Sequence, residues 1–437
     1  MEKQDFFDSL QINGVSRKEI LELASKYKFM KRKPKKIDPY DFLCTVCFLS
    51  IIDTPSFNTI AAKYSAEYSL TASKQAISKK MRTETIDFFK SILELLITSK
   101  FDSYIKVDTN NYINYSRVIV QDSTIIKLPL RLFDTFSGVK NQVTSVCNAR
   151  IQSVFDLISK KMVYFSIDPY YKNDLSSAHE LEICKGDLVL RDRGYFIYDE
   201  VQRHLNEKAD CIYRYKTGIT LLNPETDEVI DIYNLLKKEK NIDMYVCLNN
   251  KARTKVRLIA SPVNDSLANE RRRKAKKNTM GRNPSEQVLK LLSWTIFITT
   301  IPKEKADVKA VFEIYSLRWS IEIIFKAWKS HSAFDKIHNM SEKQLKVILF
   351  ARFIMIVIIT NFIYARFSKI IFDENSKYLS LLKLFNYISK NSEQIYILLS
   401  NQSDNNKNFA LQNLTKYCTY DNRKRYNSVQ IFEDYIN

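Results

Sequence analysis

Two short apolar segments, each closed by an aspartate, constrain the fold more than any other feature of this 437-residue chain. The first, RVIVQD, ends at Asp122, and the second, GDLVLRD, ends at Asp192. Both are rich in β-branched and aliphatic residues, which is typical of buried strands. A polar, helix-compatible stretch, residues 174–184, precedes the second strand. Strands that alternate with helical segments predict an α/β fold in which each aspartate stands at the carboxyl end of a strand.

The character of the sequence changes along the chain and predicts four parts, because a chain of this length exceeds what one core usually organises. Residues 1–105 show the apolar periodicity of helices and form a helical N-terminal domain. The α/β part combines residues 106–209 with residues 303–370. Short strands and a basic segment fill residues 210–302, which we interpret as a β-strand-rich insertion. Residues 371–437 form a helical C-terminal region.

Residues 56–81 of the N-terminal part predict two short helices around a turn at residues 69–71, with Thr71 as the N-cap of the second helix. Two interpretations stay open. The pair is either a DNA-binding helix-turn-helix or an ordinary helical hairpin whose exposed face is basic.

The chain carries 68 Lys and Arg against 49 Asp and Glu, a formal net charge of +19. A positive field of this size attracts polyanions, so nucleic acid is the first expected partner. Two basic runs, residues 26–36 and residues 271–277, are the expected phosphate contacts. The alternative is an AT-rich coding sequence, which enriches Lys, Asn and Ile without any binding role.

Cysteine and hydropathy patterns indicate a cytoplasmic protein. The seven cysteines are scattered and odd in number, which fits a reducing compartment. Cys44 and Cys47 form a C-x2-C pair inside an apolar run without a second pair, so core packing is favoured over zinc. The opening residues lack a secretory signal. Residues 347–364 are apolar but contain Arg352 and Asn361, which favours a buried helix over a membrane span.

A helix predicted at residues 308–330 carries Tyr315, Arg318, Glu322 and Lys329 at offsets of 0, 3, 7 and 14. At roughly 100° per residue, these four side chains lie within about 60° of one another on the helix surface. They form one polar stripe, and a plain solvated face is the alternative. The opposite side is apolar and is expected to be buried: Ile321, Ile324, Phe325 and Trp328.

The four residues of this stripe match, in type and spacing, the Y-x2-R-x3-E-x6-K signature of insertion-sequence transposases of family four. The chain further resembles that family in the Asp-Ser-Thr at Asp122, the Asp-Arg-Gly-Tyr at Asp192 and the strand-rich insertion that contains Trp294. The resemblance covers about residues 110–365. It implies a ribonuclease-H-like catalytic core interrupted by the insertion, and a DDE transposase that cuts transposon ends and joins them to target DNA.

The same resemblance implies that Asp122, Asp192 and Glu322 are catalytic and bind two Mg²⁺ or Mn²⁺ ions. The chemistry agrees, because hard cations prefer oxygen ligands and a two-metal site activates the attacking oxygen while it stabilises the leaving one. None of the four histidines shows the spacing of a metal ligand, so zinc chemistry is not expected.

DNA-binding roles follow from the resemblance as well. Arg318 and Lys329 would neutralise phosphates near the cut, and Tyr315 would add a hydroxyl donor. Trp294 would stack on a flipped base, although a core tryptophan is the alternative. The implied partners are terminal inverted repeats and target DNA, bridged by a homodimer in a nucleoid-associated complex without a membrane. The rival functions are a DNA-binding regulator without chemistry and a nuclease of the same fold without strand transfer.

Overall fold

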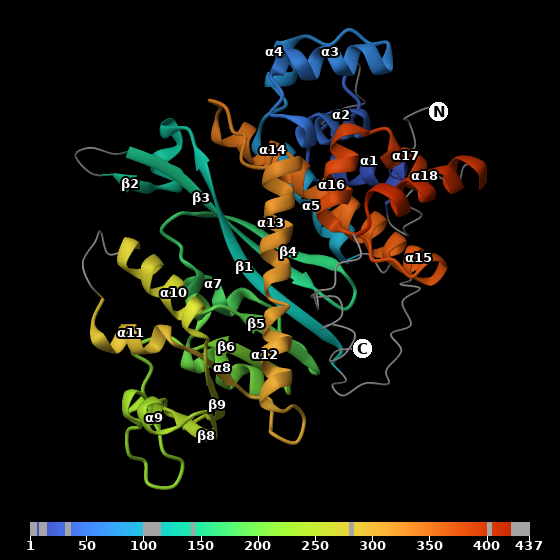
Figure 1. Cartoon of the computed structure of the whole chain (residues 1–437). Coiled ribbons are helices and arrows are strands. Elements are labelled where there is room, and N and C mark those ends of the chain that lie inside the picture. Colours follow the sequence, from blue (N-terminus) through green and yellow to red (C-terminus); the bar gives the residue numbers. More distant parts are fainter. Residues whose placement is uncertain are drawn as a thin grey trace. The chain divides into compact units, whose positions relative to one another are not determined.

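The computed structural model describes residue 7 and residues 15–30, 36–98, 115–140, 145–278, 284–399 and 404–420. Figure 1 draws the whole chain, which divides into two units by the packing of its residues. The first takes its residues from Met1–Val107, Ser123–Lys172 and Ser320–Arg425, and the second from Asp108–Asp122, Asn173–Trp319 and Tyr426–Asn437. The predicted four-part division stays a prediction, because these units group residues by packing and do not identify an insertion.

The second unit is organised by parallel strands. The first half of β1 (Arg117–Leu128) pairs in parallel with β5 (Asp187–Arg191), and β5 pairs in parallel with β6 (Asp210–Arg214). The sheet then continues through antiparallel neighbours in the order β6-β10-β9-β8-β7. The first strand predicted for the insertion therefore lies in the same sheet as β5. The bounds of the added strands are β7 Leu221–Leu222, β8 Ile242–Leu248, β9 Lys255–Pro262 and β10 Trp294–Thr299.

The first unit contributes antiparallel strands. β3 (Ser145–Asp156) and β4 (Lys161–Pro169) form an antiparallel hairpin, and β2 (Gly138–Lys140) pairs with the start of β3. β3 is also hydrogen-bonded to β1. The resulting strand order β4-β3-β1-β5-β6, with its antiparallel hairpin followed by parallel strands, confirms the α/β, ribonuclease-H-like fold.

The prediction that Asp122 closes its strand is wrong, because β1 continues to Leu128. The pairing with β5 ends at Gln121, and the residues that follow are again rich in β-branched side chains. Asp122 is therefore the first residue of β1 beyond its parallel partner. Asp192 follows β5 directly, as predicted.

The described part of the N-terminal region is helical, as predicted, and Cys44 and Cys47 are buried in its second helix. Two helices do flank the predicted turn, but Ser73 is the N-cap of the second, because its side chain accepts from the Ala76 backbone N–H at 3.2 Å. The prediction of Thr71 as the N-cap of the second helix is therefore wrong. The helices are α1 Arg17–Lys26, α2 Pro39–Ile52, α3 Phe57–Tyr68, α4 Lys74–Ser78 and α5 Thr83–Thr98. Residues 31–35 of the basic run at 26–36 lie outside the described residues.

Among the described residues, one helical run, Glu342–Asn375, is long and apolar enough to cross a membrane, and 89% of its apolar window is buried within the protein. The prediction of a buried helix is confirmed. Arg352 can be buried within this apolar run because its guanidinium donates to the Ser50 carbonyl at 2.9 Å and to the Thr54 hydroxyl at 2.7 Å. Asn361 exchanges two hydrogen bonds with the Met162 backbone, at 2.8 and 3.0 Å.

The run consists of α14 Glu342–Val357, a π-helix at Ile358–Tyr364 and α15 Ala365–Asn375. The described part of the C-terminal region then continues as helix, as predicted. Its helices are α16 Leu381–Lys390, α17 Gln394–Leu399 and α18 Asp404–Tyr417. The other helices are α6 Phe133–Phe136, α7 Asp174–Ser177, α8 Tyr198–Asn206, α9 Ile232–Lys238, α10 Asp265–Asn278, α11 Glu286–Leu292, α12 Val308–Ser316 and α13 Trp319–His331.

Candidate active site

Asp122 and Asp192 occupy equivalent positions on adjacent strands. Gln121 of β1 is the register partner of Arg191 of β5, and each candidate aspartate is the next residue along its strand direction. Both aspartates are partly exposed, whereas the two residues before them are buried. The two carboxyl groups therefore start from the same level of the parallel pair, where polar sites of α/β folds usually lie.

Arg318 contacts the first of these carboxylates. Its Nη1 lies 3.3 Å from Asp122 Oδ2, and the side chains are only 14% and 21% exposed. At this burial the pair is less screened than a surface salt bridge. The guanidinium places a fixed positive charge next to one of the two aspartates.

The prediction of one continuous helix over residues 308–330 is wrong. α12 ends at Ser316 and α13 begins at Trp319, so Arg318 lies in the two-residue break. There the backbone N–H groups of Leu317 and Arg318 donate to carbonyls three residues earlier, at 3.1 Å each, which tightens the last turn. No glycine or proline marks this break, so the sequence carries no local signal for it.

Tyr315, the first signature residue, is 9% exposed and packs against Phe297 with ring centroids 4.4 Å apart. Its hydroxyl donates to the Arg191 carbonyl at 3.3 Å. Burial raises the pKa of Tyr315 above its usual value, so the hydroxyl stays protonated as a donor. Tyr315 thus ties the end of α12 to the residue before Asp192, and its contact with DNA stays a prediction.

Glu322 and Lys329 belong to the first unit, on α13. Glu322 lies in the first turn of that helix and is partly exposed. Lys329 donates from Nζ to the Ile125 carbonyl of β1 at 3.1 Å, and burial lowers the pKa of Lys329. The predicted apolar side of the helix is confirmed, since all four of its residues are buried: Ile321, Ile324, Phe325 and Trp328.

The three candidate ligands span both units, because Asp122 and Asp192 belong to the second and Glu322 to the first. Within the described ranges, no group of three or more His, Cys, Asp or Glu side chains is arranged to hold a metal ion. The pair of aspartates fits a hard divalent cation by donor chemistry, since both supply carboxylate oxygens. Their convergence with Glu322 on two ions stays a prediction.

Trp294 begins β10 and is partly exposed. Its carbonyl accepts from Arg271 Nη1 at 2.9 Å, and Arg272 donates to the neighbouring Ser293 hydroxyl at 2.6 Å. These two arginines attach the basic helix α10 to the start of β10, while Arg273, Lys274, Lys276 and Lys277 stay exposed. Stacking of Trp294 on a base stays a prediction.

Two residues next to the aspartates were missed from the sequence. Arg191 is fully buried, and its Nε donates to Gln121 Oε1 at 2.8 Å across the β1–β5 pair. A charged residue at the end of an otherwise apolar strand, LVLR, was the available signal, because such a group is buried only when it is paired. Trp319 was missed as well, and at 59% exposure it presents a large apolar surface directly after Arg318.

A known protein family matches the part of the chain that contains these strands. The family described as "Transposase DDE domain" matches residues 115–359, more than half of the chain and the whole segment from β1 to the π-helix. The chain belongs to the DDE transposases. It is therefore an enzyme that cleaves and joins DNA, as predicted, and members of this family depend on divalent metal ions.

Relatives resemble this transposase over most of its length. It is 23% identical to the transposase of insertion sequence element IS231F from Bacillus thuringiensis subsp. israelensis, over 92% of this chain and 89% of that one. It is 27% identical to the transposase of IS1151 from Clostridium perfringens, over 89% and 86%. A piggyBac transposase synaptic complex with hairpin DNA matches with a TM-score of 0.45 at 9% identity, over 98% of this chain and 88% of that chain.

Proposed function

We propose that this transposase excises an insertion element and inserts it into target DNA, with Asp122, Asp192 and Glu322 as ligands of two Mg²⁺ or Mn²⁺ ions. The observation that carries the proposal is that Asp122 and Asp192 directly follow Gln121 and Arg191, the last register pair of the parallel strands β1 and β5. The position of Glu322 on a helix that begins directly after Arg318, the arginine that contacts Asp122, supports its role as third ligand.

Two metal ions held by Asp122, Asp192 and Glu322 would activate a water or a 3′-hydroxyl and would stabilise the leaving oxygen of phosphoryl transfer. The protein's own groups hold the DNA strand in line. Arg318 brings its charge to the edge of Asp122, where it can bind a phosphate oxygen next to the reacting group. Lys329 adds a second charge from α13, and Tyr315 holds the end of α12 against β5.

The substrate side of the proposal is double-stranded DNA. A homodimer would bind the terminal inverted repeats of the element together with the target DNA, in the cytoplasm and in association with the nucleoid. The exposed cations of α10, together with Trp294 at the start of β10, are the proposed contact with the element's end.

Single substitutions of Asp122, Asp192 or Glu322 by Ala test the site. Each should lower the rate of nicking of a transposon end in Mg²⁺ by about a thousandfold or more, because several kcal/mol of transition-state stabilisation are lost. DNA affinity should hardly change, since phosphate contacts come from cations. Arg318→Ala should lower both affinity for the cleaved end and rate.

Asp199→Ala is the matched control, because Asp199 is an exposed aspartate of α8 without a proposed role. It should nick at the wild-type rate. A Glu322→Ala protein that nicks as fast as this control would remove Glu322 from the ligand set. Strand-transfer products with a target plasmid separate a transposase from a nuclease of the same fold, and DNA binding without metal-dependent nicking would indicate a regulator.

A further inference from the structure

Three residues on adjacent strands, Gln121, Arg191 and Tyr213, form one row across the sheet. The first two directly precede the candidate aspartates. Gln121 of β1 pairs in register with Arg191 of β5, which pairs in register with Tyr213 of β6. If the register of a strand shifts by one residue, all side chains of that strand turn to the other face of the sheet. The position of Asp122 relative to Asp192 therefore depends on how firmly this row is held.

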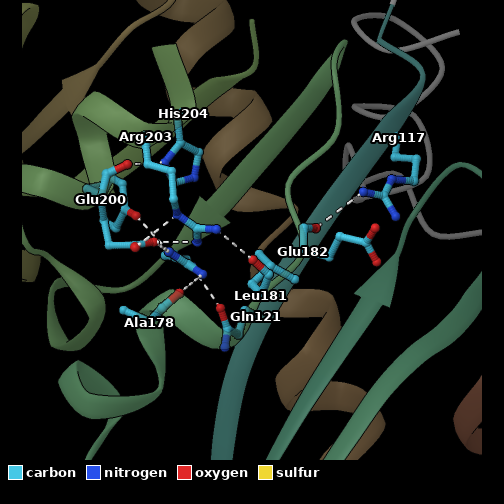
Figure 2. A network of polar contacts seen from close by, with 10 residues as sticks. Arg117, Gln121, Ala178, Leu181, Glu182, Glu200, Arg203 and His204 are labelled. Atoms are coloured by element: carbon cyan, nitrogen blue, oxygen red, sulfur yellow. Dashed lines mark hydrogen bonds and ion pairs between the residues drawn. The ribbon is translucent and has the colours of Figure 1, made fainter. Parts of the chain in front are cut away.

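Arg191 holds the row through its side chain. Its Nε donates to Gln121 Oε1 at 2.8 Å, and its Nη1 donates to the Tyr213 hydroxyl at 3.0 Å. The same guanidinium donates to Glu200 Oε2 at 3.1 Å and to the Ala178 carbonyl at 2.6 Å. One fully buried, planar group thus connects three strands with α8 and with Ala178 in the segment before β5. Figure 2 labels three of its acceptor residues, Gln121, Ala178 and Glu200.

The carboxylate of Glu200 balances the positive charges of this network. Glu200 is 5% exposed and accepts from both Arg191 and Arg203, with Arg203 Nη2 at 2.8 Å (Figure 2). These arginines hold the pKa of Glu200 below its usual value, and its negative charge keeps Arg191 protonated despite its burial. Arg191 therefore keeps the N–H groups that donate to Gln121 and Tyr213.

The backbone of Arg191 is also connected to the candidate active site, through Tyr315 and Arg318. The Arg191 backbone carbonyl accepts from the Tyr315 hydroxyl at the end of α12. Three residues later Arg318 reaches Asp122, which is the neighbour of Gln121. The side chain of Arg191 thus acts on the residue before Asp122, and its main chain anchors the helix whose following residues contact Asp122.

We propose that Arg191 is a positioning residue: by holding Gln121 and Tyr213 in one row, it fixes the separation of the two aspartates that follow and thereby sets the affinity for divalent metal. The inference rests on the proposed function, because it takes these aspartates to be metal ligands. Outer residues that orient metal ligands commonly change metal affinity by about 10- to 100-fold when they are replaced.

The test uses the purified full-length chain with Mn²⁺ alone as the probe, and measures free Mn²⁺ by electron paramagnetic resonance. Gln121→Met removes the acceptor of Arg191 Nε with little change of volume, and should raise the Kd for Mn²⁺ about tenfold. Gln121→Glu restores an acceptor and should restore the affinity. The Mn²⁺ concentration for half-maximal nicking should shift in parallel, while DNA affinity without metal stays constant.

Arg117→Lys is the matched control, because Arg117 and Asp187 form the cross-strand pair at the other end of the same β1–β5 ladder, at 2.6 and 2.8 Å. It should lower the melting temperature and leave the Kd for Mn²⁺ unchanged. If Gln121→Met does not fold, Tyr213→Phe replaces it. Its control is Tyr115→Phe, since the Tyr115 hydroxyl donates to Asp210 at 2.7 Å at the opposite end of β6.

A Gln121→Met protein that melts earlier but binds Mn²⁺ as tightly as wild type would overturn the proposal, because the row would then be structural only. Asp192→Asn separates this failure from failure of the proposed function. If Asp192→Asn binds Mn²⁺ like wild type, Asp192 is not a ligand and both proposals fall. If Asp192→Asn abolishes binding and Gln121→Met does not weaken it, only the positioning role is refuted.

Discussion

We expect the stability of the folded protein to fall at low pH because of His204, which lies on the helix that carries Glu200. It lies on α8 four residues after Glu200, it is fully buried, and its Nδ1 donates to the Glu200 carbonyl at 2.6 Å (Figure 2). Its Nε2 has no hydrogen-bond partner among the described residues. Burial lowers the pKa of His204 from 6.5 to about 4, and the nearby charge of Arg191 adds to this effect.

The sign of the pH effect follows from which state binds the proton. Below pH 6.5 the unfolded chain protonates His204, whereas the folded protein does not until about pH 4. His204 therefore contributes stability that is complete above pH 6.5 and is lost progressively as pH falls toward 4. At about 1.4 kcal/mol per pKa unit, the full loss is about 3 kcal/mol, of which about 2 kcal/mol is lost by pH 5.

The measurement compares urea unfolding of wild type and His204→Gln at pH 7.5 and pH 5.0. Wild type should lose about 2 kcal/mol more than the variant between these conditions, because Gln does not titrate. His338→Gln is the control, since the His338 side chain is 67% exposed. Carbon-13 spectra of the four histidines give the pKa directly. Parallel pH profiles of wild type and His204→Gln, or a His204 resonance that titrates near pH 6.5, would refute the reasoning.

Arg352→Met should lower the unfolding free energy by about 3 kcal/mol, because the buried acceptors at Ser50 and Thr54 lose their donor; an unchanged melting temperature would contradict this. Asn361→Leu should cost about 2 kcal/mol by the same assay, since it leaves the Met162 backbone without its two partners. DNA affinity should fall steeply with salt, and Ala at the exposed Arg273 and Lys277 of α10 should reduce the slope of log affinity against log salt by about 1 to 2. A flat salt dependence would rule out electrostatic binding.

The sequence by itself determined the fold class and the family. Apolar, β-branched runs predict strands because such side chains must be buried, and the order of strands and helices along the chain predicted the α/β class. The resemblance of the polar stripe and the two aspartate motifs to a transposase family implied the ribonuclease-H-like arrangement, and the strand order of the sheet agrees with both. The same holds for the apolar run around Arg352, where one charge and one amide were enough to favour a buried helix over a membrane span.

Only the tertiary structure decided features that depend on partners far away in the chain. β1 has two strand neighbours, β3 and β5, and it passes through Asp122 without ending although its pairing with β5 stops at Gln121. No local signal reveals which neighbours a strand will have. The helix that carries Tyr315 breaks before Arg318, so a continuous helical wheel misplaces these residues. The burial of Arg191 depends on acceptors from Gln121, Glu200 and Tyr213, which are separated from one another by up to 92 positions of sequence. A hydrogen bond requires its partners within about 3 Å, and that proximity exists only once the strands have assembled.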